Sequence, residues 1–218
     1  MGTSWDRPPR ARLVTISAAY GAAGSVVAPR VAERLGLPFA DRLIPARGGP
    51  SSSPAAECMT DEERDQVAKG AFLARLAHLT GGLNFPVPGA EDLHDQVRSR
   101  VEASIGQIAA TAGGVILGRA GAIVLAGDPR AFHVRLDGPE RRRLAQAMQM
   151  EHVDEETARA RMNETDRART RYVSRLYGRD VADPRLYHLL VDSTALPLEG
   201  CVDLVAAAAT SFWDRLCG

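Results

Sequence analysis

Lysine is nearly absent from this 218-residue chain: 26 of its 27 basic residues are arginine, and only Lys69 is lysine. Any mechanism that needs two lysines is therefore excluded, and a one-lysine mechanism depends on the surroundings of Lys69. Arginine binds phosphate and carboxylate groups through a planar, two-pronged donor set. The bias fits a protein with anionic ligands, although a preference of the source genome for arginine codons explains it equally well.

Cysteines, aromatic residues and long apolar runs are also scarce. Cys58, Cys201 and Cys217 form neither a metal-ligand spacing nor a disulfide framework, which suits a reducing cytoplasm. Aromatic residues make up 5% of the chain, too few for the stacking surface that binds single-stranded nucleic acid. No apolar run approaches the ~18 residues of a membrane span, and residues 1–12 lack the apolar core of a signal peptide. We therefore expect a cytoplasmic domain with no membrane partner.

The net charge of zero hides an uneven distribution along the chain. Between Glu57 and Glu102 there are nine acids and five bases, whereas between Arg119 and Arg179 there are thirteen arginines and nine acids. Residues 167–179 hold five arginines and no acid. The C-terminal half is therefore basic, and the middle of the chain is acidic.

Short apolar runs alternate with segments of helical periodicity, which predicts a parallel sheet with helices on both faces. The predicted strands are residues 12–17, 37–40, 114–117, 132–136 and 189–191. The predicted helices are a segment ending at Gly36, residues 60–79, 91–112 and 138–150, an arginine-rich helix capped by 152–156, and 198–216. Residues 45–56, rich in proline, serine and glycine, predict a loop.

Ligands of a parallel sheet bind beyond the carboxyl ends of its strands. Those ends are predicted at residues 18–25, Asp41, 118–119, Asp137 and 192–194. The first is a loop of small residues between a strand and a helix, an arrangement whose backbone N–H groups cradle phosphate.

The P-loop pattern G-x-x-x-x-G-K-[ST] matches this first loop only in part. Gly24 occupies the second glycine position, but Ala19 stands at the first, Ser25 at the lysine and Val26 at the magnesium-binding hydroxyl. An ordinary tight turn that packs a helix against a strand is the alternative interpretation of the loop.

Four segments carry a resemblance to a known family. They are residues 14–25 (VTISAAYGAAGS), 32–41 (AERLGLPFAD), 116–121 (ILGRAG) and 165–172 (TDRARTRY), in this order. Together they resemble the cytidylate kinase-like family of P-loop nucleoside monophosphate kinases, over roughly residues 12–44 and 114–210. The resemblance implies an α/β, P-loop kinase-like three-layer fold with a five-stranded parallel sheet, a helical monophosphate-binding segment and an arginine-rich lid.

The resemblance also implies a division of a single domain. The core is expected over residues 12–44 and 114–137, the helical insertion with the monophosphate-binding region over 45–112, the lid region over 138–180, and the C-terminal core over 186–218.

By the same resemblance, the backbone of Gly21, Ala22, Ala23, Gly24 and Ser25 wraps the phosphates of ATP. Asp41 faces the nucleoside of the acceptor, and Arg119 grips the acceptor phosphate. A helix N-cap is the alternative role for Asp41, and a surface position is the alternative for Arg119.

The lid carries a D-x-x-R element, Asp166 and Arg169, which the family uses to hold phosphates; Arg167 and Arg171 are further candidates for substrate binding. Residues three or four apart share a helix face, so Asp166 lies beside Arg169, and Arg167 beside Arg171. A solvated helix with ion pairs to Glu164 and Asp166 is the alternative for any single arginine. Most of the run 141–143 is expected to be solvated, and His133 is expected in a strand without a metal role.

The function implied is phosphoryl transfer from ATP, with Mg²⁺, to a nucleoside monophosphate, of which CMP or dCMP is favoured. We expect no metal site built from protein side chains; Asp137 or Asp41 would reach the Mg²⁺ through water. The missing lysine at Ser25 supports an alternative, a catalytically weak or inactive nucleotide-binding sensor or partner subunit of the same fold. A nucleic-acid-binding module, suggested by residues 167–179 alone, is disfavoured by the acidic middle of the chain, and a homodimer is left open.

Overall fold

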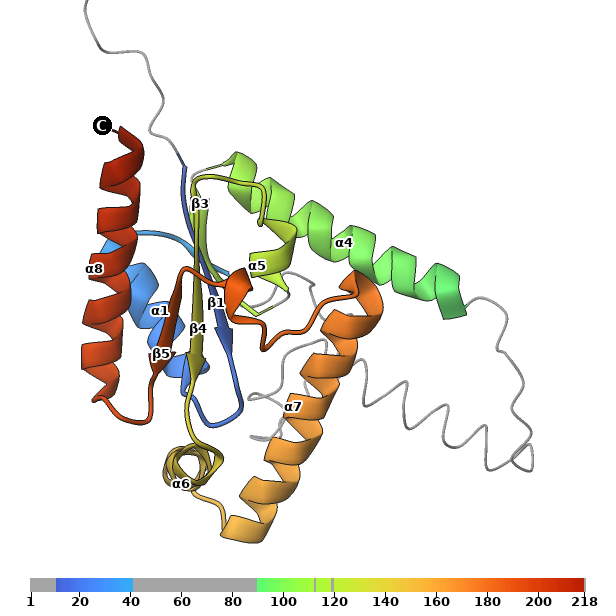
Figure 1. The fold of residues 1–218 in the computed structure, drawn as a ribbon, viewed down its shortest axis with the longest axis vertical. Helices are drawn as coiled ribbons and strands as arrows, with labels where there is room; N and C mark the ends of the chain where they lie inside the picture. The colour runs from blue at the N-terminus through green and yellow to red at the C-terminus, as the bar shows by residue number, and fades with distance from the viewer. Residues whose placement is uncertain (1–10, 41–89, 112, 119, 218) are drawn as a thin grey trace, which may run out of the picture.

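The computed structural model describes residues 11–40, 90–111, 113–118 and 120–217 (Figure 1). The predicted helix at 60–79 and the predicted loop at 45–56 lie outside these residues, as do Asp41 and Arg119. In chain order the elements are β1 (Arg12–Ala18), α1 (Gly24–Leu35), β2 (Phe39–Ala40), α4 (Ala90–Ala110), β3 (Gly113–Leu117), α5 (Gly121–Val124), β4 (Ala131–Asp137), α6 (Glu140–Glu151), α7 (Glu155–Tyr177), η1 (Pro184–Leu186), β5 (Leu189–Asp192) and α8 (Leu198–Cys217).

The five strands form one parallel sheet in the order β2-β3-β1-β4-β5, which confirms the predicted architecture. β1 lies at the centre, where Val14 pairs with Val115 of β3 on one side and with Phe132 of β4 on the other. A central parallel strand is covered on both faces, and this is why the consecutive residues Leu13 to Ile16 are all buried.

Helices cover both faces of the sheet (Figure 1). Val14 and Ile16 of β1 point toward α1 and α8, where they pack in one apolar cluster with residues such as Val27 and Val205. Leu13 points to the opposite face and packs with Val101 and Ile105 of α4. The alternation of side chains along β1 therefore divides the core into two layers.

The α6–α7 pair extends beyond the carboxyl ends of the strands (Figure 1). α7 begins at Asp154, whose side chain accepts a hydrogen bond of 2.8 Å from the backbone N–H of Thr157. Leu144 and Ala147 of α6 pack against Ala158 and Met162 of α7. The pair corresponds to the segment predicted as the lid. It places α6 next to the carboxyl ends of the strands, where ligands of such folds bind.

Two features of the fold differ from the prediction or add to it. α5 was not predicted, because a helix of four residues is too short to show helical periodicity. Pro29 lies inside α1 and removes one backbone hydrogen bond there without ending the helix, which continues to Leu35. Within the described part of the chain, none of the helices combines the length and hydropathy required to span a membrane.

His133 lies in β4, as predicted, and its side chain is buried. It is 5% exposed, its Nδ1 lies 2.8 Å from the hydroxyl oxygen of Thr15, and its ring stacks on His188 with 5.0 Å between centroids. Burial, followed by the nearby charge of His188, lowers the pKa of His133 to about 4. The imidazole is therefore neutral in the folded protein throughout the physiological range.

This burial predicts a loss of stability in mild acid. In the unfolded chain His133 binds a proton as the pH falls below about 6.5, whereas in the folded protein it does so only near pH 4. Between these two values protonation therefore stabilises the unfolded state. The free energy of unfolding should fall by about 2–3 kcal/mol from this group alone between pH 7 and pH 4.5. Urea unfolding at several pH values should show this slope, and His133→Asn should flatten it; equal slopes for both proteins would contradict the assignment.

Candidate functional site at the carboxyl edge of the sheet

The β1–α1 loop, residues 19–23, is held in a compact conformation by close packing. Gly21 has a φ of +74°, and a Cβ added there would lie 2.2 Å from the carbonyl oxygen of Arg143 in α6. A Cβ on Gly24 would lie 2.5 Å from the Cβ of Ala18. Ala23, with a φ of 57°, is the N-cap of α1 and has no side-chain cap. Glycine is required at these two positions because the chain lies directly against α6 at Gly21 and against the end of β1 at Gly24.

Side chains from distant elements bind the carbonyl groups of this loop. The carbonyl of Tyr20 accepts from Nη1 of Arg143 at 2.7 Å, and that of Gly21 accepts from Nε2 of Gln146 at 3.0 Å. The carbonyl of Ala22 accepts from the hydroxyl of Ser193 at 2.9 Å, and this serine is fully buried just beyond β5. The carbonyls are therefore unavailable to a ligand and fixed in direction.

Several backbone N–H groups of the same segment are left without an acceptor. The N–H of Ala22 bonds to the carbonyl of Ala19, and that of Tyr20 bonds to Asp166. No atom among the described residues accepts from the N–H groups of Gly21, Ala23, Gly24 and Ser25. Unpaired N–H groups at the start of a helix attract anions, because they carry the positive end of the helix dipole. The segment therefore has the donors of a phosphate cradle.

Asp166 of α7 connects the α6–α7 pair to the loop. One carboxylate oxygen accepts from the N–H of Tyr20 at 2.9 Å, and the other lies 2.8 Å from Nη1 of Arg143. Nη1 of Arg169 lies 3.7 Å from the first oxygen, so the D-x-x-R pair is adjacent, as predicted.

The side chain of Tyr20 is buried between α6 and α7. It packs with Leu144 and Met162, and its hydroxyl donates to Glu151 at 2.8 Å. Glu151 also accepts a hydrogen bond from Nη1 of Arg161 at 2.6 Å and forms an ion pair with it. The loop is thus attached to the helix pair by a side chain as well as through its backbone.

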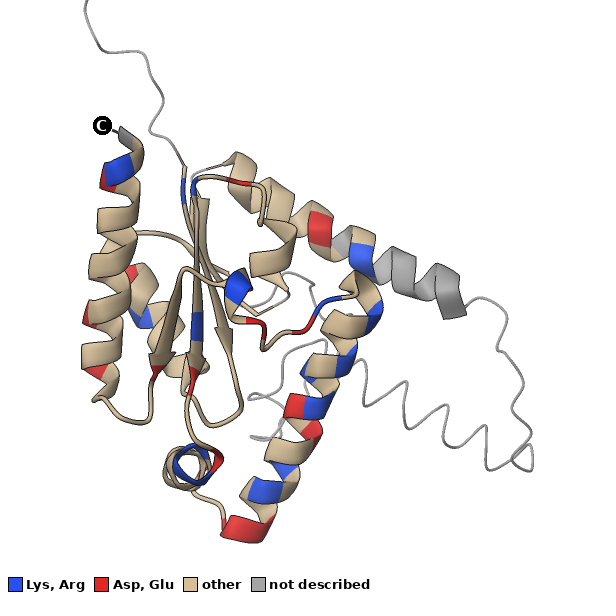
Figure 2. Ribbon diagram, viewed as in Figure 1, with Lys and Arg blue, Asp and Glu red and all other residues tan. Residues whose placement is uncertain are grey.

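Acidic residues end β4 and β5, and each is paired with an arginine (Figure 2). Asp137 accepts from Nη2 of Arg135 at 2.7 Å. Asp192 forms an ion pair with Arg142 and accepts from the Thr194 hydroxyl at 2.6 Å, and this hydroxyl is the main cause that lowers the pKa of Asp192. The described residues include no group of three or more histidine, cysteine or acidic side chains that could hold a metal ion.

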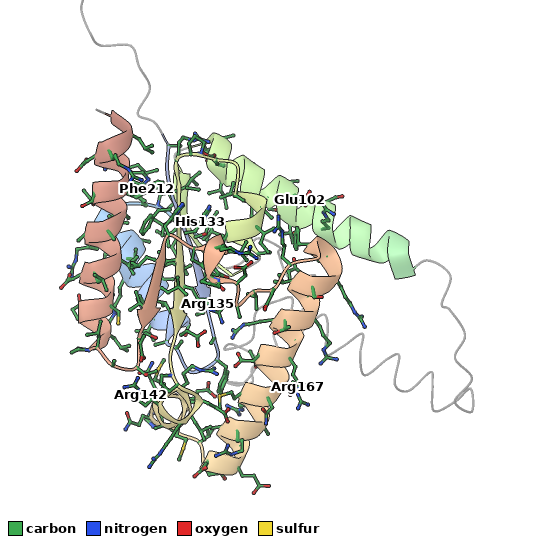
Figure 3. All side chains as sticks on the ribbon, viewed as in Figure 1. Glu102, His133, Arg135, Arg142, Arg167 and Phe212 are labelled. Atoms are coloured by element: carbon green, nitrogen blue, oxygen red, sulfur yellow. The ribbon has the colours of Figure 1, made fainter. Side chains whose placement is uncertain are left out.

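The structure brings some of the predicted site residues together and separates others. Gly21, Ala22, Ala23, Gly24 and Ser25 form the loop end and the start of α1, and Asp166 and Arg169 lie beside them. Arg167 and Arg171 are exposed, and Arg167 lies on the side of α7 that faces away from the sheet (Figure 3). These two arginines do not reach the loop among the described contacts.

Arg143, Gln146 and Ser193 were not predicted as site residues. Arg141 and Arg142 are exposed, as expected for most of that run, but Arg143 has a side chain only 12% exposed. Its position beside buried Leu144, one helical turn before buried Ala147, is the sequence signal that could have identified it. Ser193 lies in one of the predicted strand-end segments.

Comparisons with known proteins identify the family and the fold of the chain. Residues 13–195 match the model of the cytidylate kinase-like family. Among solved structures, an uncharacterised protein from Eubacterium ventriosum ATCC 27560 is similar at 19% identity, with 92% of this chain and 99% of that chain covered and a TM-score of 0.63. A gluconokinase from Sinorhizobium meliloti 1021 is similar at 16% identity, with 96% and 97% covered and a TM-score of 0.55.

A comparison with curated protein sequences produced no match. The two structural similarities support the fold, and the family model covers most of the chain, including β1, the β1–α1 loop and the α6–α7 pair. The chain therefore belongs to the cytidylate kinase-like family.

Proposed function

We propose that the protein transfers a phosphoryl group from ATP to a nucleoside monophosphate, with CMP or dCMP as the acceptor. The observation that carries the proposal is a set of backbone N–H groups, at Gly21, Ala23, Gly24 and Ser25, that have no acceptor among the described residues. They directly follow the central strand of a kinase-like fold. Phosphoryl transfer needs little covalent chemistry from the protein, because it depends on positioning and on stabilising negative charge.

The β1–α1 loop would bind the phosphates of ATP through its backbone. Each N–H group contributes a donor, and the N-terminus of α1 adds the positive end of its dipole. Ser25 is exposed at the position where a P-loop carries lysine, so the charge of that lysine has no counterpart in the first turn of α1. The loop thus supplies direction and hydrogen bonds, with less charge than a complete P-loop.

The acceptor would bind on the side of the α6–α7 pair. Arg169 lies beside Asp166 and close to the loop, so it is the described arginine best placed to stabilise a transferring phosphoryl group. Arg119 and Asp41 remain candidates for the acceptor phosphate and the nucleoside on the family resemblance. Arg167 and Arg171 would take part only if the acceptor extended around α7.

Mg²⁺ would enter with the nucleotide. No group of acidic side chains forms a metal site among the described residues, and Asp137, Asp166 and Asp192 are each bonded to arginine. This donor set suits an ion that keeps several waters and is held mainly by phosphate oxygens, as Mg²⁺ is in kinases. When bound, the ion neutralises charge on those oxygens; Asp137 could contact it through water.

The second candidate is a protein that binds nucleotide without transferring phosphate. It is favoured by Ser25 at the lysine position and by the ion pairs that neutralise Arg142 and Arg143 near the loop. Such a protein would serve as a sensor or partner subunit. Turnover measurements distinguish the two candidates.

We predict that the purified protein, with ATP and Mg²⁺, releases ADP when a nucleoside monophosphate is added, and fastest with CMP or dCMP. Gly24→Ala is the control for contaminating kinases, because its new Cβ would lie 2.5 Å from Ala18 and must displace the loop. A coupled ADP assay over a panel of acceptors provides the measurement. ADP release no greater than that of Gly24→Ala with every acceptor would reject the enzyme in favour of the second candidate.

We also predict that Ser25→Lys tightens ATP binding. A charge-assisted hydrogen bond to phosphate contributes about 1.5–3 kcal/mol, or roughly ten- to a hundredfold in affinity. Ser25→Met is the matched control, because it adds similar length without charge at the same exposed position. Calorimetric titration should show tighter binding for the lysine variant alone. Equal affinities for the two variants would mean that the phosphates do not bind at the start of α1.

A further inference from the structure

We propose that Arg143 and Asp166 are positioning residues that hold the β1–α1 loop in its anion-binding conformation from the α6–α7 pair. The inference rests on the proposed function and assigns to Arg143 a role that its sequence position did not suggest. For Asp166 it replaces the role implied by the family resemblance, which is to hold phosphate, with that of positioning the loop.

Arg143 bonds three oxygens that belong to three different elements. Its Nε donates to the carbonyl of Gly138 at 3.0 Å, and its Nη1 lies 2.7 Å from the carbonyl of Tyr20 and 2.8 Å from Asp166. The rigid guanidinium presents its donors in a fixed plane, which a lysine ammonium cannot reproduce. The side chain therefore fixes the loop relative to the turn after β4 and to α7.

Asp166 completes the attachment at the same residue of the loop. It accepts the N–H of Tyr20, while Arg143 binds the carbonyl of Tyr20. The peptide groups on both sides of the Tyr20 Cα are thus held by one bonded pair of side chains. Gly21 follows with a positive φ and lies so close to the backbone of Arg143 that a side chain has no room. The direction of the next N–H groups is set by this geometry.

The charges of the pair favour positioning over direct phosphate binding. The guanidinium of Arg143 faces the carboxylate of Asp166, with Asp137 3.6 Å from its Nε. Since the positive charge is matched by these acids, Arg143 does not replace the lysine missing at Ser25. Both carboxylate oxygens of Asp166 accept hydrogen bonds, so this residue is poorly suited to take a proton from an acceptor.

The consequence is a coupling between the lid and the donor site. A loop without lysine depends on the direction of its backbone N–H groups, and that direction depends here on side chains of α6 and α7. Loss of the Arg143 bonds should therefore weaken anion binding even though the N–H groups themselves remain.

The test compares Arg143→Lys, Arg143→Met and Asp166→Ala with wild type in the full-length protein. Arg141→Met is the matched control, because Arg141 is an exposed neighbour on the same helix. Amide hydrogen exchange, measured by NMR, reports on the loop in the free protein. Affinity for inorganic tripolyphosphate, measured by calorimetry, reports on the anion site. Thermal unfolding identifies any variant that fails to fold. If Arg143→Met does not fold, the exchange and affinity of the milder Arg143→Lys variant test the inference in its place.

We expect the Tyr20 amide to exchange at least about tenfold faster in Arg143→Met and Asp166→Ala, with tripolyphosphate affinity reduced about tenfold or more. Arg143→Lys should fail to restore either property, whereas Arg141→Met should match wild type. Rescue by Arg143→Lys would show that charge alone matters and would overturn the inference. Unchanged exchange, or faster exchange with unchanged affinity, would overturn it as well.

The failure of the proposed function is separately visible in the same experiment. Wild-type protein that binds no tripolyphosphate would refute the anion site and with it the anion-binding half of the inference. The exchange of the Tyr20 amide would still decide whether Arg143 and Asp166 hold the loop.

Discussion

The hydrogen bonds to the carbonyl groups of Tyr20, Gly21 and Ala22 are the constraint on which the candidate site depends. A buried backbone carbonyl requires a donor, and here the donors are side chains of α6 and of the turn after β5, more than 120 residues away in the sequence. Beside these bound carbonyls, the N–H groups at the N-terminus of α1 find no acceptor in the part of the chain that the structure describes. The central strand, the helix pair and the last strand therefore meet at one short loop.

The scarcity of lysine has a specific structural meaning at this loop. Arg135, Arg142 and Arg143 lie near the carboxyl edge of the sheet, and each is paired with an aspartate. The charges of these three arginines are thus balanced locally by aspartates, and Arg143 also binds a backbone carbonyl of the loop. Under the proposed function, positive charge for phosphate would come from the N-terminus of α1, from arginines such as Arg119 and Arg169, and from Mg²⁺. This is why binding and turnover are separate questions for this protein.

Much of the fold was predictable from the sequence, because apolar runs and helical periodicity are local signals. The strand at 12–17, the helix ending at Gly36 and the closing helix at 198–216 correspond to β1, α1 and α8. The loop of small residues and the adjacency of Asp166 and Arg169 were also predictable. The partners of Arg143 and Ser193 were not, because these side chains bond to a loop more than 120 residues away. The neighbouring apolar positions of α6 could have shown only that Arg143 faces inward. For Arg167 the sequence suggested a role that the fold does not favour. Its place in the motif suggested ligand binding, but it lies on the side of α7 that faces away from the sheet (Figure 3).

The central claim is that phosphate binds to the backbone between Gly21 and Ser25. The most direct measurement is an NMR titration of isotopically labelled protein with an ATP analogue that cannot be hydrolysed, in the presence of Mg²⁺. Our account predicts that the largest amide shift changes occur at Gly21, Ala23, Gly24 and Ser25, because their N–H groups gain acceptors. Saturable binding with the largest changes on the exposed arginine face of α7 and none in the loop would contradict it.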